Sequence, residues 1–381
     1  MSNDFNILTS SLKYDDEVLD KGEEPEKFTG DIKKYRFHTS GGDIPIRSLI
    51  EQVKEGEIKI PNLQRNYVWN LKTASRFIES VLLDLPLPSI FLAKQKDKTF
   101  LIVDGLQRLT ALKKYCYGEP YDNNRLFKLS NSDDIDKGWR GKAFNELSEE
   151  DQRQIRNKSL HAIIIEPKEP NDIDGLFVIF ERINTGGTQL NQQEIRNAIF
   201  QNSINEMLND LNLGKKWRSL FGHIDPNSRM RDIEMILRFF ALKNFDFSNP
   251  KSNNFIRMLN DFMGQDADDN AIQQYKIQFV NMVDFVTEKF DDTIFRTDPK
   301  NKIISQKFYA TIFDAVAISI DFALRNKIEL LPNHKDNFMS LLENKDFNFY
   351  IGKHTTGKQA IIGRINLACE TLFGRSYETK V

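Results

Sequence analysis

The stretch Val103-Asp104-Gly105-Leu106-Gln107-Arg108-Leu109-Thr110 joins two structural patterns with no loop between them. Before it, residues 99–103 form a short apolar run that predicts a strand. After it, apolar residues recur at helical spacing through residues 105–117. The sequence therefore predicts that a buried strand turns directly into a helix at Gly105.

A junction of this kind is chemically suited to binding an anion. The first N–H groups of a helix have no intrahelical partner, and the helix dipole is positive at this end. Gly105 lets a ligand approach the backbone, Arg108 adds a positive charge, and Gln107 is suited to orienting a water molecule. Asp104 either caps the helix or binds a divalent ion through a carboxylate oxygen. The glycine patterns GxxxxGK[ST] and GxGxxG are absent here.

The helix expected before this junction, over residues 71–83, carries Glu79. Asn70 is suited to be its N-cap, and Pro86 and Pro88 follow its end. Glu79 is either a second carboxylate for the same metal ion or part of a solvated helix face.

A second cluster, Pro61-Asn62-Leu63-Gln64-Arg65-Asn66-Tyr67-Val68-Trp69, lies between a predicted strand at 57–60 and the helix at 71–83. Gln64 beside Arg65 presents several fixed donors to a phosphate or a base edge, and the ring of Tyr67 can stack. The alternative is structural, with the aromatic residues as core anchors and the arginine in an ion pair.

A third cluster, Phe180-Glu181-Arg182-Ile183-Asn184-Thr185-Gly186-Gly187-Thr188, follows a predicted helix at 173–182. Its glycines can form a nest of N–H groups, beside neutral partners for phosphate or ribose. The candidate binding residues are Arg182, Asn184, Thr185, Gly186 and Gly187. A plain helix-loop-helix corner is the other interpretation.

The pattern of elements changes along the chain. Up to about residue 204 short strands and helices alternate, with further strands expected at 34–40, 89–93 and 161–166. Beyond it only helices are predicted, at 230–243, 254–263, 271–290, 305–326, 335–342 and 361–373. We therefore expect an α+β protein with an acidic leader at 1–30, a nucleotide-binding domain at 31–204, and a helical partner or effector domain at 205–381.

Composition limits the other classes of function. The 53 Lys and Arg against 55 Asp and Glu give a net charge of -2, so no global field favours DNA. Neither a CxxC pair nor a Cys/His cluster with zinc spacing occurs, and no apolar run approaches the ~18 residues of a membrane span. We expect a cytoplasmic protein without membrane contact. Of the five histidines, His223 begins a motif that lacks the later His and Asn of a nuclease, so no nuclease centre is predicted.

Several motifs in order resemble the domain of unknown function 262 family. They are QRNYVW at 64–69, IESVLLDLPLPSIFL at 78–92, VDGLQRLTAL at 103–112, FERINTGGTQLN at 180–191 and EIRNA at 194–198. The resemblance covers roughly residues 46–200. It implies a ParB/sulfiredoxin-like fold in this part of the chain, similar to the GmrS half of GmrSD type IV restriction systems.

The resemblance also implies an NTP-binding and Mg²⁺-dependent NTP-hydrolysing module of prokaryotic defence against phage or foreign DNA. It does not distinguish GTP, UTP, CTP and ATP. Two of the family's motifs are implied to contact the nucleotide. One matches Asp104, Gly105, Gln107 and Arg108, and the other matches Gln64 and Arg65. Leu106 stands where the family usually has Gln, which leaves base preference and turnover open.

A second class of function is a DNA-binding or scaffold module that grips phosphates without turnover and recruits a separate nuclease subunit. Its basic patches are residues 215–218 and 353–358. A second copy of the chain is a further candidate partner.

Overall fold

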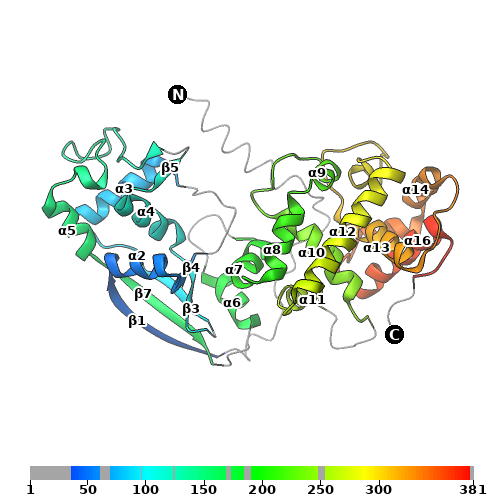
Figure 1. The fold of residues 1–381 in the computed structure, drawn as a ribbon, viewed down its shortest axis with the longest axis horizontal. Helices are drawn as coiled ribbons and strands as arrows, with labels where there is room; N and C mark the ends of the chain where they lie inside the picture. The colour runs from blue at the N-terminus through cyan, green and yellow to red at the C-terminus, as the bar shows by residue number, and fades with distance from the viewer. Residues whose placement is uncertain are drawn as a thin grey trace. The chain divides into compact units, whose positions relative to one another are not determined.

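The computed structural model describes residues 36–60, 69–95, 97–122, 125–168, 173–183, 190–247 and 254–377 (Figure 1). The chain divides into two compact units, one ending at Ile199 and the other beginning at Phe200. The first unit mixes strands and helices, and the second is built of helices. The α+β prediction, with a helical C-terminal part, is therefore confirmed.

A five-stranded mixed sheet in the order β1-β7-β3-β4-β2 forms the centre of the first unit. Its strands are β1 (Phe37–Pro45), β2 (Ile58–Lys59), β3 (Ile90–Lys94), β4 (Phe100–Asp104) and β7 (Ser159–Pro167). β7 pairs antiparallel with β1 and parallel with β3, while β4 pairs antiparallel with β3 and parallel with β2. The short strands β5 (Pro120–Asp122) and β6 (Arg125–Leu126) form a separate pair.

Helices cover the middle of this sheet because its strands β3 and β4 are apolar on both sides, whereas the edge strand β1 is largely exposed. The helices α2 (Ile46–Glu55), α3 (Leu71–Leu82), α4 (Leu106–Tyr117) and α5 (Glu149–Asn157) share one core with strand residues such as Ile90 and Ile102. Leu101 and Val103 alternate with Ile102 along β4 and are also buried, which requires cover on the opposite face. The helix α6 (Ile173–Ile183) contacts β4, and α7 (Gln192–Ile199) follows it.

The second unit packs its helices around α13. They are α8 (Ser203–Asn212), α9 (Lys215–Phe221), α10 (Arg231–Asn244), α11 (Phe255–Met263), α12 (Asp269–Lys289), α13 (Ala310–Asn326), α14 (His334–Glu343), α15 (Lys345–Gly352) and α16 (Lys358–Phe373). α13 contacts α10, α12 and α16. In this core Phe239, Phe240, Phe279, Phe308 and Phe313 are buried, whereas Phe285 is half-buried and its ring centroid lies 6.4 Å from that of Phe373.

The main differences from the sequence predictions have local causes. The strand predicted at 34–40 continues to Pro45, because pairing with β7 extends it through Gly41 and Gly42. The helix predicted from residue 305 begins at Ala310. The helices α8, α9 and α15 have 10, 7 and 8 residues, which is too short for a clear apolar period.

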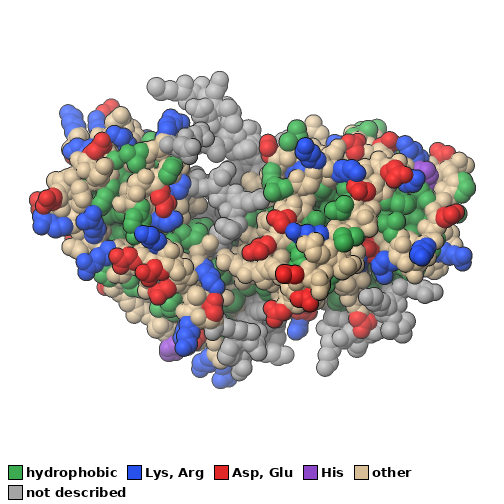
Figure 2. All heavy atoms as spheres, in the orientation of Figure 1, with side chains coloured by type: hydrophobic (Ala, Val, Ile, Leu, Met, Phe, Trp, Pro, Cys, Tyr) green, Lys and Arg blue, Asp and Glu red, His purple; other side chains and the backbone are tan. Residues whose placement is uncertain are grey.

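The surface carries charges of both signs, and both cysteines are free thiols. Figure 2 shows Lys and Arg side chains interspersed with Asp and Glu on the visible face of each unit. Burial raises the pKa of the Cys116 thiol to about 12 and that of Cys369 to about 11, and neither forms a disulfide. Within the described ranges, no helix is long and apolar enough to cross a membrane.

Candidate functional site

The predicted junction between strand and helix exists at Gly105. β4 ends at Asp104, α4 begins at Leu106, and Gly105 between them has φ 101°, in the left-handed region. A Cβ atom on Gly105 would lie 2.5 Å from Ile90 Cγ2 on β3, so this position requires glycine. As the N-cap residue, Gly105 has no side chain to accept from the first N–H groups of α4, which therefore suit an anion.

Asp104 and Arg108 form an ion pair across this junction. Arg108 Nη2 donates to Asp104 Oδ2 at 2.6 Å and to the carbonyl oxygen of Ser89 at 3.0 Å. The two side chains are 29% and 15% exposed, respectively. The predicted capping role of Asp104 is wrong, because the left-handed turn makes Gly105 the N-cap and directs the carboxylate to Arg108.

One donor of the Arg108 guanidinium, the Nε–H group, makes no hydrogen bond to the described residues. The Nε atom is buried. Leaving such a donor unsatisfied costs about 1–3 kcal/mol, so unpaired buried donors call for a specific explanation. A bound anion is one group that would satisfy it.

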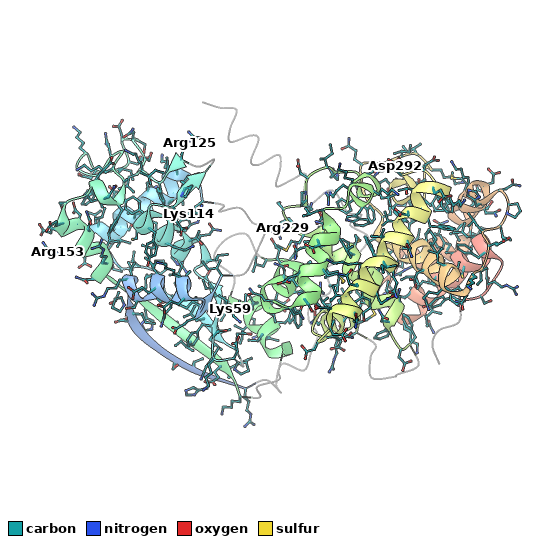
Figure 3. The ribbon with its side chains drawn as sticks, viewed as in Figure 1. Lys59, Lys114, Arg125, Arg153, Arg229 and Asp292 are labelled. Atoms are coloured by element: carbon teal, nitrogen blue, oxygen red, sulfur yellow. The ribbon has the colours of Figure 1, made fainter. Side chains whose placement is uncertain are left out.

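Gln107 contacts the end of the second sequence cluster. Its Oε1 accepts from the backbone N–H of Trp69 at 3.4 Å. The hydroxyl of Tyr121, on β5, donates to the carbonyl oxygen of Trp69. Lys114, labelled in Figure 3, donates from Nζ to the carbonyl oxygens of Pro120 at 2.9 Å and Tyr121 at 3.2 Å. No sequence pattern points to Tyr121, because the surrounding residues 121–141 are polar and weakly patterned.

Glu79 on α3 has a structural partner in the segment before the helix α5. Its Oε1 accepts from the backbone N–H of Asp136 at 2.7 Å. One turn earlier, Ser75 Oγ accepts from Ser130 N at 2.8 Å, and Lys72 pairs with Asp134. One face of α3 thus holds the segment that contains residues 130–136. No group of three or more metal-ligating side chains occurs in the described ranges. A Mg²⁺ ion that binds with a nucleotide needs only one or two protein carboxylates, so such a site would not form a group of this size.

Part of the predicted site lies outside the described residues. These positions are Gln64, Arg65, Tyr67, Asn184, Thr185, Gly186 and Gly187. Arg182 is exposed in the last turn of α6. The structure therefore brings together Asp104, Gly105, Gln107 and Arg108, while most of the other two clusters lies outside the described residues.

The polar residues of the motif at 194–198 have structural contacts. Glu194 Oε2 accepts from Asn191 N at 2.7 Å and Asn191 Oδ1 accepts from Glu194 N at 2.9 Å, which is a reciprocal cap of α7. Arg196 Nη1 donates to Gln193 Oε1 at 3.1 Å. All four residues except the half-buried Asn191 are buried.

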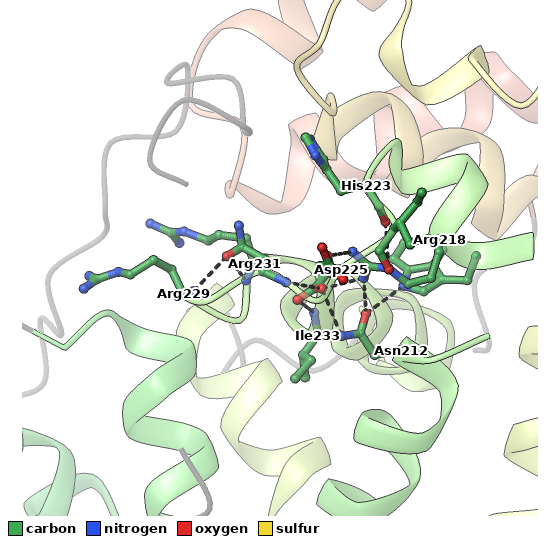
Figure 4. A network of polar contacts seen from close by, with 11 residues as sticks. Asn212, Arg218, His223, Asp225, Arg229, Arg231 and Ile233 are labelled. Atoms are coloured by element: carbon green, nitrogen blue, oxygen red, sulfur yellow. Dashed lines mark hydrogen bonds and ion pairs between the residues drawn. The ribbon is translucent and has the colours of Figure 1, made fainter. Parts of the chain in front are cut away.

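The basic patch predicted at 215–218 in the second unit is only partly a surface, because Lys215 and Lys216 are exposed but the other two residues are buried. Trp217 and Arg218 are only 1% and 6% exposed, and Lys216 pairs with Asp284 at 2.7 Å. Arg218 Nη1 donates to Asp232 Oδ2 at 2.6 Å, and Nε donates to the carbonyl oxygen of His223 at 2.8 Å (Figure 4). This arginine fixes the loop before α10. Lys353 and Lys358 in the other patch are exposed.

The described junction lies within a stretch that is similar to a known family. A comparison of the chain with curated proteins gave no match. Residues 46–201 match the family described as GmrSD restriction endonuclease, N-terminal domain. This stretch includes Gly105, Arg108, Trp69 and α7, and it ends where the helical unit begins. Residues 46–201 therefore form a restriction-system-related module, similar to the N-terminal domain of GmrSD restriction endonucleases.

Proposed function

We propose that this module binds a nucleoside triphosphate at the N-terminus of α4 and hydrolyses it with Mg²⁺, as the regulatory part of a prokaryotic restriction-like defence system. The observation that carries the proposal is the junction at Gly105. There the N–H groups of a helix meet an arginine whose Nε is buried and has no partner among the described residues. The family similarity supports the biological setting.

Phosphoryl transfer depends chiefly on positioning and on stabilisation of negative charge. The N–H groups of α4 would bind phosphate oxygens, and Arg108 would neutralise part of the charge. The contacts of Arg108 with Asp104 and Ser89 hold its guanidinium in place before a ligand arrives. Gln107 would orient the attacking water. Gln64, Arg65, Tyr67, Arg182 and residues 184–187 are the expected further contacts to the nucleotide.

Asp104 fits a magnesium ion that arrives with the nucleotide. Mg²⁺ usually takes one or two carboxylates together with phosphate oxygens and water. Arg108 engages Asp104 Oδ2, so the other carboxylate oxygen, Oδ1, is the ligand atom that we assign to the ion. Bound Mg²⁺ would polarise the phosphates. Glu79 is the proposed second carboxylate, although its Oε1 already accepts from Asp136 N.

Release of phosphate from the four common NTPs, with and without Mg²⁺, tests the proposal. We expect turnover of at least one NTP and its loss in Arg108→Ala, with Arg108→Lys retaining part because the charge remains. Arg153→Ala, at an exposed arginine of α5, is the matched control and should keep full turnover (Figure 3). Thermal unfolding establishes that each variant is folded. Unchanged turnover in folded Arg108→Ala would contradict the assignment of the site.

DNA and a separate nuclease subunit are the proposed partners of the system. The helical unit is the part of the chain that we assign to these contacts, since the family match ends at residue 201. Co-purification of a nuclease subunit with the full chain, and its loss when the helical surface is mutated, would test this assignment.

A further inference from the structure

The backbone N–H and the carbonyl oxygen of Trp69 each form a hydrogen bond with a side chain. The N–H donates to Gln107 Oε1 at 3.4 Å, and the carbonyl oxygen accepts from the hydroxyl of Tyr121. Tyr121 is in turn tied to α4, because Lys114 Nζ donates to its carbonyl oxygen at 3.2 Å. Gln107 and Lys114 are seven residues apart, so they lie on the same side of α4 two turns from each other. The contacts therefore form a closed ring from α4 through Trp69 and Tyr121 back to α4.

This ring fixes the orientation of the Gln107 amide. A backbone N–H only donates, so the side-chain oxygen of Gln107 must face Trp69 and its NH₂ group must face the other way. A glutamine side chain otherwise has several rotamers, and restricting it costs about 1.5–2 kcal/mol of entropy. The fold meets this cost before any ligand is present.

Aromatic packing holds Trp69 and Tyr121, the two residues in this closed ring of contacts that lie outside α4. The ring of Trp69 packs edge-on against Phe77 of α3, with centroids 5.4 Å apart. The ring of Tyr121 packs against Phe127 with centroids 4.9 Å apart. The hydroxyl of Tyr121 can therefore be removed by Tyr121→Phe while its ring keeps its packing.

We propose that Trp69 and Tyr121 are positioning residues that act through Gln107, by holding its amide in one orientation beside the N-terminus of α4. The meaning of this arrangement for turnover rests on the proposed function, which puts nucleotide phosphates at that end of α4. The ring of contacts itself can be measured without nucleotide.

The first experiment follows the backbone amide signal of Trp69 in the full chain by NMR with ¹⁵N-labelled tryptophan. The chain has three tryptophans, Trp69, Trp139 and Trp217, which gives a spectrum with internal references. We expect Tyr121→Phe and Gln107→Ala each to shift the Trp69 signal and to leave that of Trp217 in place. Tyr117→Phe makes the same chemical change at an exposed tyrosine of α4 and should shift none of them. A Trp69 signal that stays unchanged in both variants would overturn the proposal.

The second experiment measures steady-state hydrolysis by the same variants. Tyr121→Phe should lower kcat by about tenfold and change KM by less than about twofold, since it misorients a group without removing a binding contact. The double variant Tyr121→Phe/Gln107→Ala should be no slower than Gln107→Ala alone, because Tyr121 acts through Gln107. Multiplied losses in the double variant would overturn the positioning role. If the unmodified protein hydrolyses no NTP, the proposed function fails, while the NMR measurement still decides whether the ring exists.

Discussion

An ion-pair network in the helical unit and the ion pair beside Gly105 in the first unit lie in opposite environments. In the helical unit, Asp314 lies between Arg238 and Arg364, with hydrogen bonds of 3.0 Å to Arg238 Nε and 2.7 Å to Arg364 Nη2, and all three side chains are buried. In the first unit, Asp104 and Arg108 remain partly open to solvent. A fully buried network has one low-energy arrangement, whereas a partly open pair can exchange a partner for a ligand. The network around Asp314 thus serves the packing of the helical unit, and the pair at Gly105 is the better candidate for binding.

The helix α10 supplies two of the buried cations that pair with aspartates in this unit. It contributes Arg238 to the network with Asp314, and Lys243 donates to Asp321 Oδ1 at 2.6 Å. Both aspartates lie on α13, seven residues apart, so two ion pairs fasten α10 to the same side of α13. The family match ends before α10, which means that these networks belong to the part of the chain outside it.

The largest expected effect is on the helical unit. Asp314→Ala would leave two buried arginines without their carboxylate, and we expect a loss of about 3–5 kcal/mol in its free energy of unfolding. Urea denaturation followed by circular dichroism measures this loss. Asp284→Ala, which removes the surface partner of Lys216, is the control and should cost less than about 1 kcal/mol. Equal losses in the two variants would remove the contrast between buried and open pairs.

The next effect concerns the junction of β4 and α4. Gly105→Ala places a Cβ atom 2.5 Å from Ile90 Cγ2 at a φ of 101°, so we expect a loss of about 1–3 kcal/mol. Gly42→Ala is a matched control on β1, because a Cβ there meets nothing within 4 Å. Thermal unfolding of both variants compares them. A Gly105→Ala protein as stable as Gly42→Ala would mean that the junction does not require glycine.

Helix capping should contribute similarly in the two units. Asn70 Oδ1 accepts from Thr73 N at 2.8 Å in α3, and Asn254 Oδ1 accepts from Arg257 N at 2.9 Å in α11. Replacing either by Ala should cost about 1 kcal/mol, measured by urea denaturation. We expect only Asn70→Ala to change the NMR signal of the neighbouring Trp69. A shift of that signal in Asn254→Ala would show that the distinction between the units is not local.

The smallest effect is that of a surface pair in the first unit. The hydrogen bond from Lys59 is the main cause that lowers the pKa of Asp97 from 3.8 to about 2, with Thr99 contributing. Because the folded pKa is the lower one, the stabilisation is present above about pH 4 and is lost as the pH falls towards 2. The exposure of the pair limits it to less than about 1 kcal/mol. Stability measured at pH 5 and pH 3 should therefore fall more in the unmodified protein than in Asp97→Asn, and parallel pH curves would contradict this.

The sequence was most informative where a pattern is local. The helix predicted at 254–263 is Phe255–Met263 in the structure, and the predicted cap Asn70 makes the expected bond. It was misleading at Arg218, which looked like part of a basic surface, because its partner Asp232 lies 14 residues further along the chain. Tyr121 was missed for the same reason, since it contacts Trp69 across 52 residues. Periodicity and spacing carry no information about such distant partners.

The burial of Cys369 and the partial burial of Cys116 have a practical consequence for spectroscopy. A thiol reacts with maleimides or iodoacetamide as the thiolate, and pKa values of about 12 for Cys116 and about 11 for Cys369 leave almost none at neutral pH. One cysteine introduced at an exposed position of either unit would therefore take a fluorophore or spin label selectively. The native sequence thus provides a background in which a single-site probe needs no prior removal of cysteines.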